Sequence, residues 1–150
     1  MRNFTLFVLA SFILLSAACT PAAKTISITT QGGKCSLDSG TRVSAGEVSV
    51  KFTNKDAAPP INGLWFLTLK EGKGYQDLVD LKWTVDVDFP PTWSVWQGDM
   101  HGDPNSQNEK IFLFKEGPLF VVCLSGEQSV VTKEHPITSY GVLGPIQVVK

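Results

Sequence analysis

The residues of this chain that could carry distinctive chemistry are a few sulfur- and nitrogen-bearing side chains. They are Cys19, Cys35, Met100, His101, Cys123 and His135. A thiolate, two imidazoles and a thioether are the ligand types of a copper electron-transfer centre, but affinity also requires their geometry. His101 lies 22 residues before Cys123 in a stretch with no strand pattern, and His135 lies 12 residues after it, next to Pro136. Both histidines are typical of solvated loops, so a metal site built from His101, Cys123 and His135 is the less favoured interpretation.

Cys19 follows a short apolar run near the N-terminus, from Phe4 to Leu15. The run is too short to span a bilayer, which takes about 20 residues, and it has the build of a secretory signal. Leu14–Cys19 resembles the lipobox of bacterial lipoproteins, although Ser16 stands where leucine is commonest. The resemblance implies cleavage after Ala18 and lipidation of the Cys19 thiol. The alternative is an ordinary secretory signal, with Cys19 incidental.

A lipid on Cys19 would make the membrane the first partner of this protein. The sequence then divides into a signal peptide (1–18), a lipidated tether (19–23) and one domain (24–150). Thr20 is not aspartate, which favours the outer membrane in a diderm source and otherwise the outer face of the cell membrane. The net charge is −1 and no basic stripe is present, so nucleic acid is not an expected partner.

Cys35 and Cys123 remain once Cys19 is assigned to the lipid. In an exported chain, an even remainder of cysteines is typical of a disulfide. We therefore predict one bond between them. Two free buried thiols, or a metal thiolate at Cys123, are the alternatives.

The periodicity of the chain is mostly that of β-strands. Apolar residues alternate with polar ones at 25–29 and 47–52, and 64–69 is apolar on both faces. Two further segments, 110–114 and 119–124, resemble a hairpin around 116–118. The last predicted strand is 146–149. Tyr75, Leu78 and Leu81 predict one short helix that begins after Gly74, and 83–103 reads as irregular. Short strands separated by turns predict an all-β sandwich.

The order of these segments resembles that of the cupredoxins. The matching segments are 43–48, 50–54 with 60–62, 120–123, and 142–148. The resemblance implies a Greek-key β-sandwich, and the helical insertion is similar to that of copper-less cupredoxin-like lipoproteins of environmental bacteria.

The departures from the family concern the copper ligands. Ile61 and Ile137 stand where the two histidines belong, and Val142 stands where the axial methionine belongs, which leaves Cys123 alone. The resemblance therefore implies a domain without copper or another cofactor. It also places Cys35 close to Cys123, at the corner of the sandwich that holds the metal in the family.

Three tryptophans could bind a ligand by stacking, namely Trp83, Trp93 and Trp96. We favour a packing role, in which they close one end of the sandwich. The chain lacks the common nucleophile, phosphate and zinc motifs, so we expect no enzyme. The favoured function is a lipid-anchored extracytoplasmic domain that binds an unidentified protein or small molecule, or has a structural role in the envelope. A copper or electron-transfer protein with unusual ligands and a carbohydrate- or peptide-binding module are the alternatives.

Overall fold

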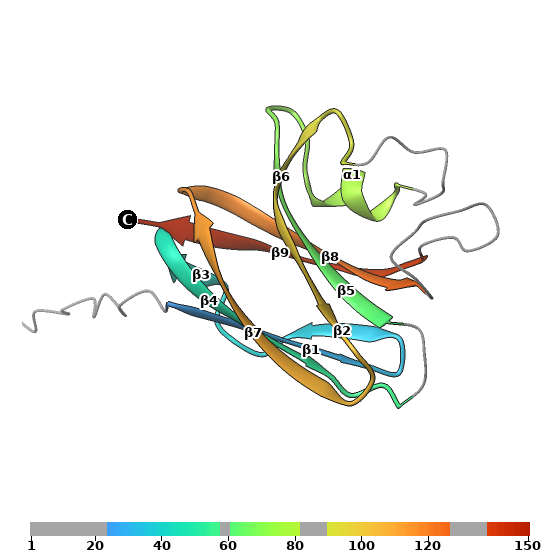
Figure 1. Ribbon diagram of the computed structural model, residues 1–150. Helices are drawn as coiled ribbons and strands as arrows, with labels where there is room; N and C mark the ends of the chain where they lie inside the picture. The colour runs from blue at the N-terminus through green and yellow to red at the C-terminus, as the bar shows by residue number, and fades with distance from the viewer. Residues whose placement is uncertain (1–23, 58–60, 82–89, 127–137) are drawn as a thin grey trace, which may run out of the picture.

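Two β-sheets face each other in the computed structural model, which describes residues 24–57, 61–81, 90–126 and 138–150 (Figure 1). The four-stranded sheet has the order β2-β1-β4-β7. Its strands are β1 (Thr25–Gln31), β2 (Lys34–Leu37), β4 (Gly46–Asn54) and β7 (Ser106–Phe114). The five-stranded sheet has the order β3-β9-β8-β5-β6. Its strands are β3 (Arg42–Ser44), β5 (Ile61–Leu69), β6 (Ser94–Gly102), β8 (Gly117–Gly126) and β9 (Thr138–Val149).

The pairing of the strands mixes parallel and antiparallel neighbours. β1 runs parallel to β4, and β3 runs parallel to β9, whereas the other paired neighbours are antiparallel. One helix, α1 (Tyr75–Val79), follows β5. The predicted all-β sandwich with one short helical insertion is confirmed. Along the described parts of the chain, no helix is both long and apolar enough to cross a membrane.

The inner core, between the two sheets, is built from the alternating strands that the sequence predicts. Successive side chains of a strand point to opposite faces, so every second residue of β1 and β4 is buried. Phe66 of β5 lies at the centre, with its ring centroid 4.9 Å from that of Phe112 and 5.5 Å from that of Phe114. The inner core is therefore closed by aromatic side chains from both sheets.

A second apolar cluster, the outer cluster, lies on the opposite face of the five-stranded sheet. Its buried residues are Leu67, Leu78, Phe120, Val122 and Leu124. Figure 1 shows α1 above β8 and β9, and Leu78 is the buried residue of that helix. This cover explains why β5 is apolar on both faces, since its alternate residues pack in the two different clusters.

The helix begins where the sequence predicts, directly after Gly74. The Asp77 carboxylate accepts a hydrogen bond from the Gly74 N–H at 2.9 Å. It also forms an ion pair with Lys73, whose Nζ lies 2.7 Å from Asp77 Oδ1. The Lys73 ammonium, followed by the Gly74 amide, holds the pKa of Asp77 below its usual value. The Tyr75 hydroxyl donates to the Val142 carbonyl oxygen at 3.2 Å and so links α1 to β9.

The predicted hairpin of 110–114 with 119–124 is wrong. β7 pairs with β4 in one sheet, and β8 pairs with β5 and β9 in the other. The two-residue connection of Lys115 and Glu116 therefore carries the chain from one sheet to the other. A short turn favours pairing of the strands that it joins, but the long-range pairing of β8 with β5 and β9 decides where β8 lies.

The prediction that 83–103 is irregular is wrong over its second part, because residues 94–102 form β6. Its inward positions include Gly98 and Gly102, where apolar side chains would be expected. A Cβ at Gly98 would lie 2.7 Å from Phe112 Cε1, and one at Gly102 would lie 2.9 Å from Phe52 Cε1. Aromatic rings of the other sheet fill the space over these glycines, so the strand lacks the alternation that sequence patterns detect.

Candidate functional site

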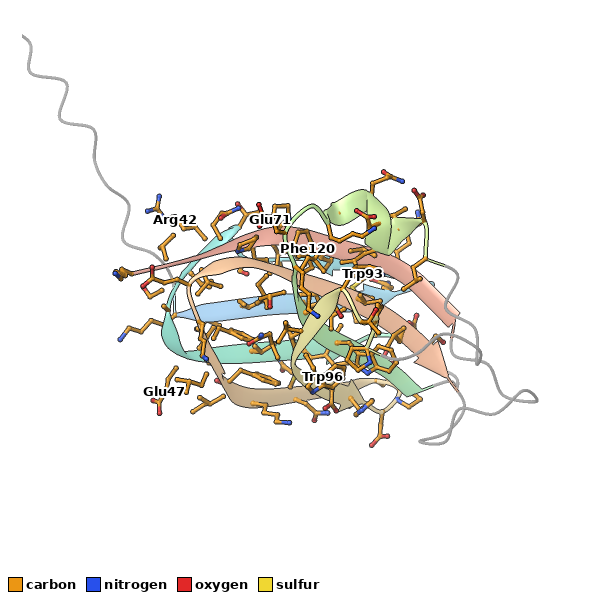
Figure 2. The ribbon with its side chains drawn as sticks, turned by 90° about the horizontal axis from the view of Figure 1, so that it is seen from above. Arg42, Glu47, Glu71, Trp93, Trp96 and Phe120 are labelled. Carbon is orange, nitrogen blue, oxygen red and sulfur yellow. A yellow bond between two sulfur atoms is a disulfide. The ribbon has the colours of Figure 1, made fainter. Side chains whose placement is uncertain are left out.

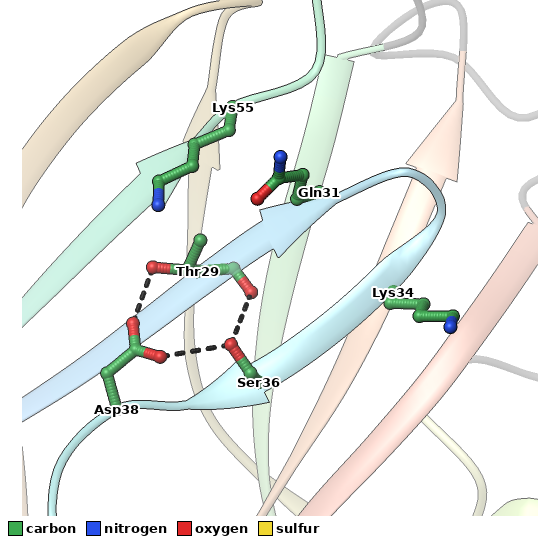
Figure 3. Close-up of a pocket in the computed structure, with 6 residues that line it drawn as sticks. All are labelled: Thr29, Gln31, Lys34, Ser36, Asp38 and Lys55. Carbon is green, nitrogen blue, oxygen red and sulfur yellow. Dashed lines mark hydrogen bonds between the residues drawn. The ribbon is translucent and has the colours of Figure 1, made fainter.

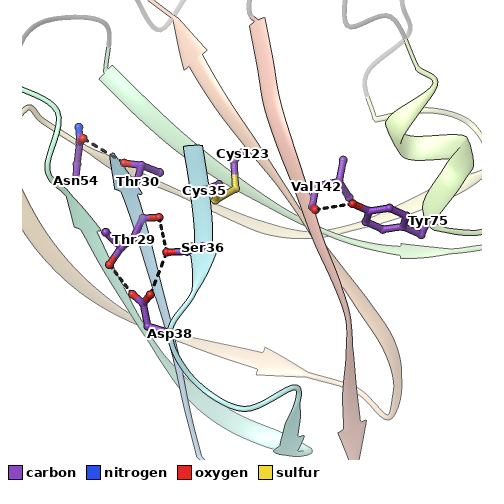
Figure 4. The surroundings of a disulfide bond; sticks show 9 residues. All are labelled: Thr29, Thr30, Cys35, Ser36, Asp38, Asn54, Tyr75, Cys123 and Val142. Atoms are coloured by element: carbon purple, nitrogen blue, oxygen red, sulfur yellow. Dashed lines mark hydrogen bonds between the residues drawn. A yellow bond between two sulfur atoms is a disulfide. The ribbon is translucent and has the colours of Figure 1, made fainter. Parts of the chain in front are cut away.

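The first candidate site is the corner where the cupredoxin resemblance places a metal. Cys35 of β2 and Cys123 of β8 form a disulfide there, with Cα atoms 6.4 Å apart (Figure 4). Cys123 is fully buried in the inner core, and Cys35 packs against that core from the edge of the four-stranded sheet. The predicted disulfide is therefore present, and it joins the two sheets.

The position that the resemblance assigns to the axial ligand lies on the other face of the sheet. Val142 pairs with Val122, and both pack in the outer cluster. The residue opposite Cys123 on β9 is Gly141, and a Cβ there would lie 3.5 Å from Cys35 Cβ. A side chain at 142 therefore does not share the face that carries Cys123.

Met100 and His101 are also separated by the sheet. Met100 is buried in the inner core, whereas the His101 side chain is 60% exposed and lies 3.0 Å from the Asp99 carboxylate. Both lie on β6 rather than in the predicted irregular loop, so their alternation along the strand is fixed. Among the described residues, no three His, Cys, Asp or Glu side chains gather closely enough to hold a metal ion. His135 and Ile137 lie outside the described residues.

A buried asparagine beside this corner was not among the predicted site residues. Asn54 ends β4 and is 1% exposed. Its amide donates to the carbonyl oxygens of Gly102 at 2.9 Å and Asp103 at 3.1 Å, and its Oδ1 accepts the Thr30 hydroxyl at 3.1 Å. Asn54 thus ties β1 and β4 to the β6–β7 connection. The only signal for this role in the sequence is that Asn54, an amide, occupies the last inward position of the alternating segment that forms β4.

The predicted tryptophan site divides into two places. Trp93 is half-buried against the outer cluster, and Lys73 Nζ lies 5.4 Å from its ring centroid. Trp96 is 36% exposed and meets Trp65 edge to face, with centroids 5.8 Å apart. Figure 2 shows Trp93 and Trp96 apart from each other across the molecule. Trp83 lies outside the described residues.

A polar hollow of about 470 Å³ lies on the outer face of the four-stranded sheet (Figure 3). Its lining residues are Thr29, Gln31, Lys34, Ser36, Asp38 and Lys55. The Asp38 carboxylate accepts hydrogen bonds from the hydroxyls of Thr29 and Ser36. The hollow lies beside the β1–β2 turn, where Gly32 and Gly33 have φ of 60° and 67°, as hairpin turns of this kind require. The hydrogen bonds of Asp38 with Thr29 and Ser36 hold β2 against β1, and so they help to keep Cys35 of β2 in place.

The described strands form a two-sheet β-sandwich, and solved structures of similar fold include two copper proteins. The chain is similar to reduced auracyanin from the photosynthetic bacterium Roseiflexus castenholzii, with a TM-score of 0.45 and 16% identity over 68% of this chain and 85% of that one. It is also similar to a multi-copper oxidase from Pediococcus acidilactici, with a TM-score of 0.38 and 16% identity over 81% of this chain. The chain covers 27% of the oxidase's length. No family model matches the chain, and neither does any curated protein.

Proposed function

We propose that this protein is a lipid-anchored extracytoplasmic domain that keeps a cupredoxin-like framework without a copper site and serves as a binding or structural component of the cell envelope. The proposal excludes an enzymatic role and a resident cofactor. The anchor is the lipid on Cys19, and the envelope is the compartment that such a lipid implies.

The observation that carries the proposal is the Cys35–Cys123 disulfide. A blue-copper centre needs a thiolate, and the sulfur of Cys123 is bonded to another sulfur instead. Val142, which packs in the outer cluster, adds support because it faces away from that sulfur. A disulfide between sheets is also typical of chains that fold in an oxidising compartment, which agrees with export.

The anchor is tested by metabolic labelling of the full chain with clickable palmitate in a bacterial host. We expect label on the wild type and on Cys35→Ala, the matched cysteine control, and none on Cys19→Ala, which should leave the membrane fraction. A labelled and membrane-bound Cys19→Ala protein would refute the anchor.

The absence of copper is tested by incubating the purified protein with Cu(II), followed by dialysis and metal analysis. We expect less than stoichiometric copper and no thiolate-to-copper absorption band. One tightly held copper per chain with such a band would favour the electron-transfer alternative.

A binding role has its own observation in the exposed Trp96, which stands beside Trp65 on the outer face of the five-stranded sheet. Exposed aromatic rings of this kind stack on sugars and on apolar peptide side chains. Screening of immobilised glycans and peptides should give ligands whose binding Trp96→Ala abolishes. Val95→Ala, an exposed neighbour, should leave binding unchanged. Equal binding by Trp96→Ala would remove this surface from consideration.

A further inference from the structure

One end of the sandwich is fixed by the place where β1 begins. Thr25 pairs with Ser49 of β4, and Ser49 pairs with Ile111 of β7, so these residues form one row across the sheet. The Ser49 N–H also donates to the Lys24 carbonyl oxygen at 2.9 Å. Leu113 pairs with Glu47, which lies beyond this row toward the same end. We call this the tether end, since the chain from Cys19 enters the domain here.

The outer face of β7 changes character toward the tether end. Gln107 and Glu109 occupy its distal half, and Ile111 and Leu113 follow at the next outward positions. The two apolar side chains are 65% and 72% exposed, which makes them the most exposed of the large hydrophobic residues described. On a sheet face whose neighbouring outward positions on β4 are Ser49 and Glu47, this apolar pair is not explained by packing within the domain.

The tether limits how far this end can lie from a membrane. Six residue steps separate Cys19 from Thr25, and they span at most about 20 Å when fully extended. A nine-residue strand such as β7 is about 30 Å long. The tether is shorter than this strand, so the two ends of the domain cannot lie equally close to the membrane. The tether end is the end that a lipid on Cys19 holds against the bilayer surface.

We propose that Ile111 and Leu113 form a membrane-contact ledge, which dips into the interfacial region of the lipid bilayer and tilts the domain onto the β7 side of its tether end. The proposal rests on the lipid anchor of the proposed function. Exposed apolar side chains are suited to the headgroup boundary, and basic residues at the same end of a domain add attraction to anionic lipids. Lys24, Arg42 and Lys115 are exposed near this end and can meet lipid phosphates, and Figure 2 shows Arg42 and Glu47 at the end of the molecule away from Trp96.

The contact is tested on palmitoylated protein purified from bacterial membranes and reconstituted in nanodiscs of phosphatidylethanolamine and phosphatidylglycerol. A fraction of the lipid carries a gadolinium headgroup, and methyl NMR relaxation reports proximity to it. We expect several-fold faster relaxation for the methyl groups of Ile111 and Leu113. The methyls of Val95, which is exposed on the opposite sheet, should show no such change.

A variant arm separates contact from simple tethering. The Ile111→Ser, Leu113→Ser double variant changes two exposed side chains, so the fold should be kept. It should retain the palmitate but lose the enhanced relaxation of nearby methyl groups, with Val95→Ser as the matched control. Relaxation at Ile111 and Leu113 no faster than at Val95 would overturn the ledge while leaving the anchor intact. Loss of palmitate labelling would instead overturn the proposed function. Concentration-dependent dimerisation that the double variant abolishes, without relaxation enhancement, would assign the pair to a second copy and also overturn the ledge.

Discussion

The inner core and the outer cluster lie on the two faces of the same strands, yet they are held in different ways. The inner core is covered by a complete second sheet and is crossed by the disulfide of Cys35 and Cys123. Within the part of the chain that the structure describes, the outer cluster is covered by a five-residue helix, of which Leu78 alone is buried. The Lys73–Asp77 ion pair and the hydrogen bond from Tyr75 to Val142 hold this helix. From this difference we expect the inner core to contribute more to the stability of the domain than the outer cluster does.

The largest expected effect comes from the disulfide, because it closes a long loop and so restricts the unfolded chain. Its loop of 88 residues corresponds to about 4.6 kcal/mol of unfolding free energy in the chain-entropy model. Cys35→Ala should lower the free energy of unfolding by about this amount, and the Cys35→Ala, Cys123→Ala double variant should cost little more than Cys123→Ala. Guanidinium unfolding of all three measures this. Additive losses, or alkylation of Cys123 in the native unreduced protein, would contradict the cross-link.

A matched pair of phenylalanines compares the two clusters directly. Phe66→Ala removes the ring that joins Phe112 and Phe114, and we expect a loss of about 4 kcal/mol. Phe120→Ala removes a 5% exposed ring of the outer cluster, where the helix can settle into the space, and we expect about 3 kcal/mol. Denaturant midpoints give both values. A larger loss for Phe120→Ala would reverse the ranking of the two clusters.

Leu78→Ala should loosen the outer cluster without opening the sandwich. The side chain is fully buried and is the apolar anchor of α1, so we expect a loss of about 2–3 kcal/mol. Val79→Ala, at a 46% exposed position of the same helix, should change stability by about 0.5 kcal/mol or less. Amide hydrogen exchange should speed up in α1 while β1 and β4 stay protected. Equal loss of protection in β1 would mean that the two clusters unfold together.

The smallest expected effect is on the pH dependence of stability, through Asp77. The pKa of Asp77 is lowered in the folded state, first by Lys73 and then by the Gly74 amide. Its contribution to stability is therefore present above the unfolded pKa of about 4 and is lost as the pH falls through the lower folded value. Asp77→Asn should show a smaller difference in unfolding midpoint between neutral and acidic solution than the wild type. An unchanged difference would remove Asp77 from the acid response.

The parts of the fold that the sequence predicts are those with local signals. Alternation predicts β1 and β4, apolar residues on both faces predict an inner position for β5, and Gly74 followed by Tyr75 and Leu78 predicts α1. Each of these signals is complete within a few residues. The disulfide is predicted differently, from the two cysteines that remain if Cys19 carries the lipid, although they lie 88 residues apart.

The missed parts depend on distant partners. β6 escapes detection because Phe112 and Phe52 fill the places over Gly98 and Gly102. β8 is misassigned because its partners, β5 and β9, are remote in sequence from the turn that precedes it. At the candidate site, no local pattern shows that Val142 faces the outer cluster or that Asn54 is buried, since both depend on how the strands are registered across the sheets.

The placement of β9 has a consequence for how the chain folds. β9 lies between β3 and β8, and its pairing aligns Arg42 with Gln147, near opposite ends of the domain's sequence. The five-stranded sheet therefore cannot close until the last strand has arrived, and contacts of such long sequence separation make folding slow. Until then, β3 and β8 present open edges to other unfinished chains, which is the state in which aggregation competes with folding. Folding of the domain is thus complete only when segments from both ends of its sequence have paired, whichever strand forms first.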